Sequence, residues 1–398
     1  MSNLYPVKGV RLATAQAGIK HKDRDDVLLI ELDEKATTAA VFTRNAFCAA
    51  PVTVAKTHLQ NANPRYLLVN SGNANAGTGD QGLRDAQDTC KSLGAAAFCP
   101  LNQILPFSTG VIGQALPTAK IAAVMPALLE SLSAYHWDTA AKAIMTTDTV
   151  PKLVSRKIKI DNKDVTVTGI AKGSGMIRPD MATMLSYVAT DATVNKELLH
   201  QCLVDAVNPS FNSITVDGDT STNDACVLMA TGHGELRFES ADDDGYHEFA
   251  ALVKDVCMKL ARMIVLDGEG ATKLITIDVE KALSEDEARD VAFTIAHSPL
   301  VKTAMFASDP NWGRILAAVG RAGVKKLSID DVKIYLGDVC IVENGGVAAT
   351  YTEEQGQKVM DEPEILVRVI LNRGKASTRV LTCDFSYDYV KINAEYRT

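Results

Sequence analysis

The sequence predicts a mixed α/β fold with layered sheets. Short apolar or β-branched runs typical of strands occur along the whole chain, together with segments of helical periodicity. Apolar residues make up 46% and charged residues 23% of the 398 positions, which are ordinary globular values. At roughly 150 residues per domain, this length accommodates two or three domains or one large fold. Neither an internal repeat nor a low-complexity linker divides the chain.

In the first 170 residues the sequence predicts mainly short strands. These are predicted at 27–32, 39–43, 52–55, 66–69, 153–160 and 165–170. A small-residue loop over 70–79 precedes a helix that begins near Asp80 and stops at Gly94. Helical composition returns over 117–133, where Pro126 predicts a kink or a break.

The second half contains the clearest helices. We predict helices over 194–207 and 246–265, the latter with an apolar stripe at helical spacing. Ser284 and Glu287 have the spacing of a capping box, which predicts a further helix start. Strands are expected to return at 273–279, 332–336, 365–371 and 379–385.

Charge and cysteine content favour a cytoplasmic protein that does not bind nucleic acid. The net charge is −8, with +5 on residues 1–182 and −13 on 183–398, an asymmetry that would favour association of the two halves. No run of eighteen apolar residues predicts a membrane span, and the start of the chain does not resemble a secretory leader. The eight cysteines form no C-x-x-C pair and are expected to be free thiols.

Several familiar catalytic and binding motifs are absent from the sequence. It contains no G-x-x-x-x-G-K-[ST] loop, no G-x-G-x-x-G after a strand and no H-E-x-x-H pair. The stretch 217–224 resembles a calcium loop, but Thr222 and Leu228 stand where Gly and Glu are required, so we expect a turn-rich loop held by Asx hydrogen bonds. Ser174 is not a nucleophile elbow, because Lys172 takes the place of the first glycine. The histidines on helical stretches, His136, His200 and His247, are expected to be surface or satisfied residues.

The most unusual segment runs from Lys172 to Asp191. A glycine-punctuated loop leads into Ala182-Thr183, and an apolar strand follows directly. The hydroxyl of a Thr in this position can attack the preceding carbonyl, and hydrolysis of the resulting ester leaves the Thr as a new N-terminus. Its α-amine, with an ordinary pKa of about 7.7–8.0, can then serve as base for its own hydroxyl. Judged from residue types alone, this pattern more often belongs to an ordinary buried Thr at a loop-to-strand junction than to a self-cleaving one.

The segment resembles the processing site of the ornithine acetyltransferase family, also called the bifunctional glutamate N-acetyltransferase of arginine biosynthesis. Further blocks match the family in order along almost the whole chain, at 69–75, 108–113, 144–149, 267–272, 309–314 and 389–398. One position departs from the family pattern, because Asp180 stands where Asn is usual. This extra negative charge near the nucleophile could alter the rate of processing.

The resemblance implies a self-cleaving α-β-β-α sandwich of the N-terminal-nucleophile type. Cleavage between Ala182 and Thr183 would give an α chain, 1–182, and a β chain, 183–398, that assemble as a heterotetramer of two α and two β chains. Thr183 would be the nucleophile, and Thr109 with Gly110 the oxyanion hole. The residues implied to bind substrate, besides Thr183, are Thr146, Lys172, Glu269, Asn393 and Thr398. Thr147 and Thr149 compete with Thr146 for its role, and neither a metal nor a cofactor is implied.

The activity implied is acetyl transfer from N2-acetyl-L-ornithine to L-glutamate through an acetyl-Thr intermediate. Some family members also accept acetyl-CoA as donor. One alternative is a self-processing aminopeptidase or amide hydrolase of related fold, in which water replaces glutamate. Another is a metabolite-binding protein whose loop never cleaves. We further expect Gly110→Ala to slow catalysis while leaving the fold largely intact.

Overall fold

A computed structural model describes residues 4–178 and 184–395 of the chain. The expected cleavage residues Ala182 and Thr183, the departure at Asp180 and the terminal Thr398 lie outside the described residues. The chain forms two compact units. The first consists of Met1–Gly173, Pro179–Asn212 and Thr220–Ile264, and the second of Ser174–Arg178, Ser213–Asp219 and Val265–Thr398.

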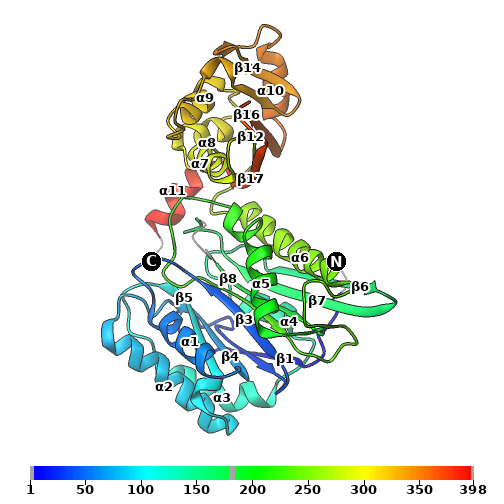
Figure 1. The fold of residues 1–398 in the computed structure, drawn as a ribbon. Helices are drawn as coiled ribbons and strands as arrows, with labels where there is room; N and C mark the ends of the chain where they lie inside the picture. Colours follow the sequence, from blue (N-terminus) through cyan, green and yellow to red (C-terminus); the bar gives the residue numbers. More distant parts are fainter. Residues whose placement is uncertain (1–3, 179–183, 396–398) are drawn as a thin grey trace. The chain divides into compact units, whose positions relative to one another are not determined.

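Two sheets form the centre of the first unit (Figure 1). One sheet has the order β1-β2-β4-β5 and contains β1 (Val10–Ala15), β2 (Val27–Leu32), β4 (Tyr66–Asn73) and β5 (Ile104–Val111). The other has the order β3-β10-β8-β7-β6 and contains β3 (Thr37–Phe42), β6 (Lys152–Ile160), β7 (Lys163–Lys172), β8 (Leu185–Thr190) and β10 (Ala225–Ala230). The pairs β4–β5 and β8–β10 are parallel, and the remaining neighbours are antiparallel. A short parallel pair, β9 (Thr193–Val194) and β11 (Arg237–Phe238), lies apart from both sheets.

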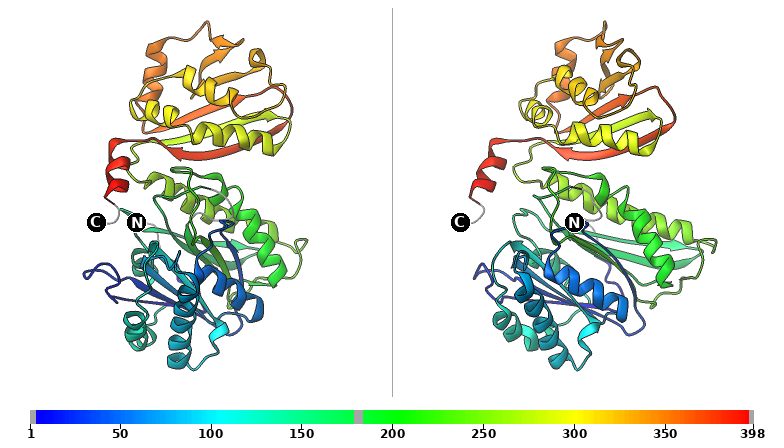
Figure 2. Two further views of the ribbon diagram at one scale, coloured as in Figure 1. Left: turned by 90° about the vertical axis from the view of Figure 1, so that its left-hand side faces the viewer. Right: turned by 60° about the vertical axis from the view of Figure 1, so that its left-hand side comes forward.

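Helices cover the outer faces of this sheet pair (Figure 2). The helices α1 (Ala50–Asn61), α2 (Gly79–Ala97) and α3 (Thr118–Glu130) bury apolar side chains against the first sheet. The helices α5 (Lys196–Val207) and α6 (Tyr246–Leu266) cover the second sheet, where the Cα of Gly169 on β7 faces Val256 and Leu260 of α6. The layers therefore run helix, sheet, sheet, helix, which confirms the expected α-β-β-α sandwich.

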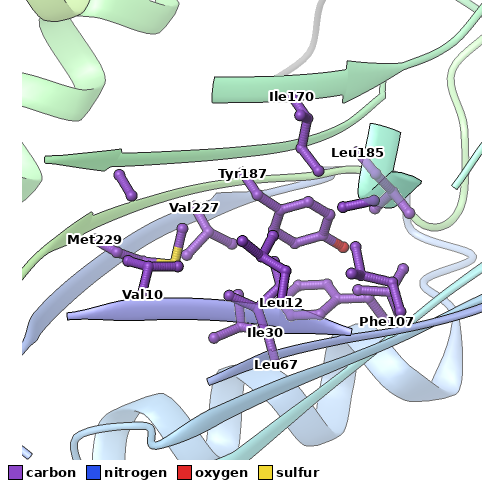
Figure 3. Close-up of a cluster of buried hydrophobic side chains, with 14 of the residues drawn as sticks. Val10, Leu12, Ile30, Leu67, Phe107, Ile170, Leu185, Tyr187, Val227 and Met229 are labelled. Atoms are coloured by element: carbon purple, nitrogen blue, oxygen red, sulfur yellow. The ribbon is translucent and has the colours of Figure 1, made fainter. Parts of the chain in front are cut away.

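A large apolar core fills the space between the two sheets (Figure 3). It contains Leu12, Ile30 and Leu67 from the first sheet and Tyr187 and Val227 from the second. The short helix α4 (Trp137–Ala143) also contributes to this core. Alternate residues of each strand point inward, as expected for strands with one face on a shared core.

The second unit contains one mixed sheet of order β15-β14-β13-β16-β12-β17. Its strands are β12 (Leu274–Ala282), β13 (Lys333–Leu336), β14 (Val339–Glu343), β15 (Gly346–Val347), β16 (Glu364–Ile370) and β17 (Ala376–Cys383). The helices of this unit are α7 (Glu285–Ala296), α8 (Pro299–Phe306), α9 (Trp312–Gly320), α10 (Glu353–Met360) and α11 (Tyr387–Ala394). Buried residues of α7, α8, α9 and α10 join the strands in a separate core. The Ser284 hydroxyl accepts a hydrogen bond from the Glu287 N–H at 3.1 Å, as expected at the start of α7.

Several predicted elements differ from the structure, each for a physical reason. The strand predicted at 52–55 is wrong, because Pro51 sits in the first turn of α1 and the apolar run forms that helix's buried face. Pro126 does not interrupt α3, whose neighbouring Met125 and Leu128 are buried in the core against the sheet. Gly94 does not end α2 either, which runs on to a left-handed cap at Phe98.

Two predicted boundaries also moved, and three long strands were missed. The predicted loop over 70–79 is strand up to Asn73, and the helix predicted from 194 starts at Lys196, after the Asn195 cap. The three long strands that sequence reasoning missed are β1, β5 and β10, and it also did not predict the shorter strands β9, β11, β14 and β15.

The two chains expected from cleavage are interleaved in the second sheet of the first unit. Strands β3, β6 and β7 precede position 182, whereas β8 and β10 follow it. Strand β8 pairs with β7 and β10 pairs with β3, so backbone hydrogen bonds join the two segments at two places in the sheet. A cut at 182–183 would therefore produce fragments that share one sheet and one core.

Candidate active site

Thr109 and Gly110 lie near the carboxyl end of β5, where this edge strand runs closely beside β4. Register pairs place Ser71 opposite Thr109 and Gly72 opposite Gly110. Gly110 has a φ of 134°, and a Cβ built on it would lie 2.3 Å from the carbonyl carbon of Gly72. The strands can approach this closely only because no side chain stands between them. The expectation that Gly110→Ala would leave the fold largely intact is therefore wrong.

A buried polar network connects the end of β5 to the start of β10. The Asn223 side-chain amide donates to the carbonyl of Ser108 at 2.9 Å and to that of Ala74 at 2.6 Å. The Ser108 hydroxyl in turn donates to the Asn70 side-chain oxygen at 2.6 Å. On β5, two residues before Thr109, the Phe107 ring meets Tyr187 of β8 edge-to-face, with ring centroids 5.4 Å apart (Figure 3). Thr109 is thereby placed at the same edge of the sandwich as the start of β10.

The start of β8 lies at this same edge. The Ala225 N–H donates to the Met184 carbonyl at 2.9 Å, and Ala225 pairs in register with Leu185. Because β8 and β10 are parallel, their first residues lie side by side. Met184 directly follows the predicted nucleophile Thr183 in the sequence, and Thr183 itself lies outside the described residues.

Thr146 and Lys172, two of the residues that the family resemblance implies bind substrate, come together in the first unit. The Lys172 ammonium donates to the Thr146 hydroxyl at 3.4 Å. The same region contains a buried carboxylate, Asp148, that accepts from the Gly173 N–H at 2.7 Å and the Thr146 N–H at 3.0 Å. These bonds fix the backbone on both sides of the Lys172–Thr146 contact.

Asp148 is also paired with Lys152, at 2.6 Å, and neither side chain is exposed. Burial raises the pKa of Asp148, but the nearby Lys152 and Lys172 ammonium groups outweigh burial and leave that pKa below its usual value. The carboxylate is therefore ionised and neutralises positive charge beside Lys172. Sequence reasoning missed this pair, although Asp148 stands inside the quoted block at 144–149.

A second carboxyl, Asp224, is buried at the start of β10. Burial raises the pKa of Asp224 well above its usual range, and hydrogen bonds from Ser221 and the charge of Lys172 only partly oppose the shift. Its Oδ2 has no hydrogen-bond partner among the described residues. Burial therefore disfavours the ionised form of Asp224, which stands directly before the register pair of Ala225 with Leu185.

Glu269 and Asn393 come together in the second unit. The Asn393 side-chain amide of α11 donates to Oε2 of Glu269 at 2.8 Å. The Glu269 N–H donates to the Ser174 carbonyl at 2.8 Å, which holds this residue against the loop after Lys172. A Cβ at Gly175 would lie 2.5 Å from the Glu269 carboxyl carbon, so glycine leaves the space that this carboxylate occupies.

The described residues offer no metal centre and no membrane span. Within 4–178 and 184–395, no three His, Cys, Asp or Glu side chains are grouped as metal ligands. None of the described helices has the length and apolarity that crossing a bilayer requires.

The eight cysteines are free thiols. The loop 217–224 contains an Asx turn, in which the Asp219 N–H donates to Oδ1 of Asp217 at 3.2 Å.

Comparison with known proteins identifies a family over almost the whole chain. The model of the ArgJ family matches residues 11–398. The arginine biosynthesis bifunctional protein ArgJ of Methylococcus capsulatus is 60% identical over 395 residues, which cover 99% of this chain and 97% of that protein. The protein of the same name from Pseudomonas fluorescens is 53% identical over 399 residues, with 100% and 98% covered.

A solved structure supports the same relationship. The crystal structure of arginine biosynthesis bifunctional protein ArgJ from Bacillus halodurans is 38% identical and superposes with a TM-score of 0.51. The match covers 99% of that solved chain but 53% of this one. The solved chain is therefore about half as long as the chain described here.

Proposed function

This chain belongs to the ArgJ family, and on that premise we propose that it is a self-cleaving glutamate N-acetyltransferase of arginine biosynthesis. One observation carries the assignment of the site. The Thr109–Gly110 end of β5 is bound through Asn223 to the start of β10, the parallel neighbour of the strand that follows Thr183. This connection supports the proposal that the oxyanion donors, Thr109 and Gly110, and the nucleophile, Thr183, act together at one edge of the sandwich.

In the proposed maturation step, the Thr183 hydroxyl attacks the carbonyl carbon of Ala182. The peptide C–N bond breaks as an ester to Thr183 forms, and water then hydrolyses that ester. The products are chains of 182 and 216 residues, the second with a free Thr183 α-amine. The half-length chain of the Bacillus halodurans relative supports a cut near the middle.

In the proposed transfer, the Thr183 Oγ attacks the acetyl carbonyl of N2-acetylornithine while its α-amine accepts the hydroxyl proton. The Thr109 hydroxyl and the Gly110 N–H donate to the resulting oxyanion, and each such donor typically contributes about 3–4 kcal/mol. Collapse breaks the amide C–N bond, and the ornithine amine leaves with the proton. The α-amine of glutamate then attacks the acetyl ester, which releases N-acetylglutamate and restores Thr183.

The substrate-binding roles follow from charge and hydrogen bonding. Lys172, beside the Thr146 hydroxyl, suits the α-carboxylate that both substrates carry. Glu269, oriented by Asn393, suits an ammonium group. We assign a substrate contact to Thr398 on the family resemblance alone. We also propose a cytoplasmic heterotetramer of two α and two β chains, and acetyl-CoA as a second acetyl donor.

Thr183→Ala tests the proposal most directly. The variant should remain a single chain on denaturing mass analysis and transfer no acetyl group, whereas the parent should give two fragments with Thr183 as a new N-terminus. Thr139→Ala, on the exposed face of α4, is the matched control and should behave like the parent. Two fragments from Thr183→Ala would refute the nucleophile.

A second assay separates transfer from hydrolysis. N-acetylornithine should release ornithine rapidly only when glutamate is present. Equal release without glutamate would instead indicate an amide hydrolase.

A further inference from the structure

We propose that a pocket beside the edge strand β3 binds a small organic acid, a molecule with a carboxylate on a short apolar body. The pocket has a volume of about 320 Å³ and is lined by residues of β3, α1 and α5, all within the first unit. This volume lies at the lower end of the range of small-molecule sites. The residues assigned above to catalysis and substrate binding do not line it, so the pocket is additional to the proposed active site.

The charged side chains in the wall of this pocket are basic. Lys56 of α1 and Lys196 and His200 of α5 line the pocket, and among the described residues no carboxylate does. Neither ammonium group forms an ion pair with any other part of residues 4–178 and 184–395. Two cations without a counter-charge in one cavity favour an anionic ligand, because they attract it and can form charge-assisted hydrogen bonds with it.

Single long contacts hold both ammonium groups at the wall. The Lys196 Nζ donates to the Leu59 carbonyl at 3.3 Å, which joins α5 to α1, and the Lys56 Nζ donates to the Thr43 carbonyl at 3.5 Å. The Lys56 Nζ also lies 5.6 Å from the centroid of the Phe42 ring. Because an ammonium group has three N–H donors, both lysines retain donors for a ligand.

The free edge of β3 adds backbone donors to the same cavity. The Thr43 N–H donates to the Asp224 carbonyl at 3.0 Å, in the antiparallel pairing of β3 with β10. Backbone groups alternate in direction along an antiparallel strand, so those of Thr38, Ala40 and Phe42 point away from β10. No second strand pairs with β3 in the described parts of the chain, and these three residues line the pocket. Their N–H groups can therefore donate to an acceptor that binds there.

The rest of the wall is mainly apolar. Ala39, Phe42 and Leu59 provide a surface that suits a short hydrocarbon body. The Thr38 hydroxyl is fully buried in this wall and has no hydrogen-bond partner among the described residues. Buried polar groups rarely lack a partner, and an acceptor bound in the pocket would supply one. The wall as a whole therefore fits an acid with an apolar body better than a purely polar anion.

The experiment follows the binding of hexanoate to the purified, isotope-labelled protein by NMR, with the Ala40 N–H as the reporter. Hexanoate should shift the Ala40 signal until the pocket is saturated. Hexylammonium, which has the same chain length and the opposite charge, should not shift it. Acetate and inorganic phosphate should bind at least about tenfold more weakly than hexanoate, because they bury less apolar surface.

Matched substitutions then locate the site. Lys56→Gln and Lys196→Gln should each weaken hexanoate binding at least about threefold, and together about tenfold, because each removes one charge-assisted contact. Lys254→Gln, at an exposed position of α6, removes the same charge outside the pocket and should bind like the parent. Lys196 is exposed, so its variant should unfold at the parent midpoint and tests binding independently of folding.

Three results would overturn the inference. These are unchanged affinity in both pocket variants, an equal Ala40 shift with hexylammonium, and equal affinity for hexanoate and inorganic phosphate. A loss of affinity in Lys254→Gln as large as in the pocket variants would overturn it as well, because the effect would then be one of net charge. Neither self-cleavage nor acetyl transfer enters this measurement, so its failure is distinct from failure of the proposed function.

Discussion

Gly110→Ala should destabilise the protein strongly, because the close approach of β5 to β4 leaves no room for a methyl group. The new Cβ would lie 2.3 Å from the Gly72 carbonyl carbon and 2.5 Å from the Asn73 nitrogen. These are backbone atoms that cannot rotate away, so the strands must separate. A side chain at a φ of 134° adds strain of about 1–3 kcal/mol, and overpacking adds about 1–3 kcal/mol. The sum is a large share of a typical stability of about 5–15 kcal/mol.

Gly113→Ala is the matched control for this prediction. Gly113 also has a positive φ, 82°, but a Cβ there would meet nothing within 4 Å. It therefore carries the backbone strain without the clash. Urea denaturation of the two variants, compared at the same state of cleavage, should show Gly110→Ala less stable than Gly113→Ala by about 1–3 kcal/mol.

Equal unfolding midpoints for the two variants would refute the argument from close approach. The prediction also matters for testing the site. A loss of acetyl transfer in Gly110→Ala cannot be assigned to a missing oxyanion donor, because the strand that presents Thr109 is displaced as well.

Three further predictions follow from the same geometry. Thr109→Val removes a hydroxyl donor at nearly constant volume and should lower kcat of the cleaved enzyme about 10²–10³-fold, with Thr109→Ser recovering most of it; an unchanged kcat would exclude the oxyanion role. Because the folded pKa of Asp148 lies below its unfolded value of about 3.9, the ionised group stabilises the protein above that pH, and this contribution is lost as pH falls through the folded pKa. Acid should therefore destabilise the parent more steeply than Asp148→Asn below about pH 4, and parallel acid-denaturation curves would contradict this. After cleavage, the two fragments should co-elute on native size exclusion and separate only in denaturant, because β3–β10 and β7–β8 join them; separation in native buffer would argue against the shared sheet.

The sequence predicted the long, strongly patterned elements well. The paired strands β6 and β7, the helix α6 and the start of α7 were all expected, because their apolar periodicity or capping residues act locally. It failed where tertiary contacts outweigh local preference. The run at 52–55 has strand-like residues but forms the buried face of α1, and β5 contains Pro106 and Gly110, which read as a turn in isolation.

The candidate site was predicted in part. Residue types together with the family resemblance indicated Thr109, Lys172 and Glu269. They did not indicate Asp148, Asp217 or Asp224. The sequence around an aspartate in a polar loop does not show whether its side chain is buried or which groups it contacts. Only the fold showed that Asp148 neutralises charge beside Lys172 and that Asp217 holds the backbone of Met176 and Ile177.

The sequence by itself indicated what chemistry the chain performs. A Thr that follows a small residue, and the series of blocks that match the family, can be recognised in the sequence without knowledge of the fold. The tertiary structure decided where that chemistry takes place. Asn223 joins β5 to β10 across 115 positions of sequence through one side-chain amide, a contact that no periodicity encodes. Such contacts depend on how two sheets pack face to face, and packing is a property of the whole chain rather than of any segment.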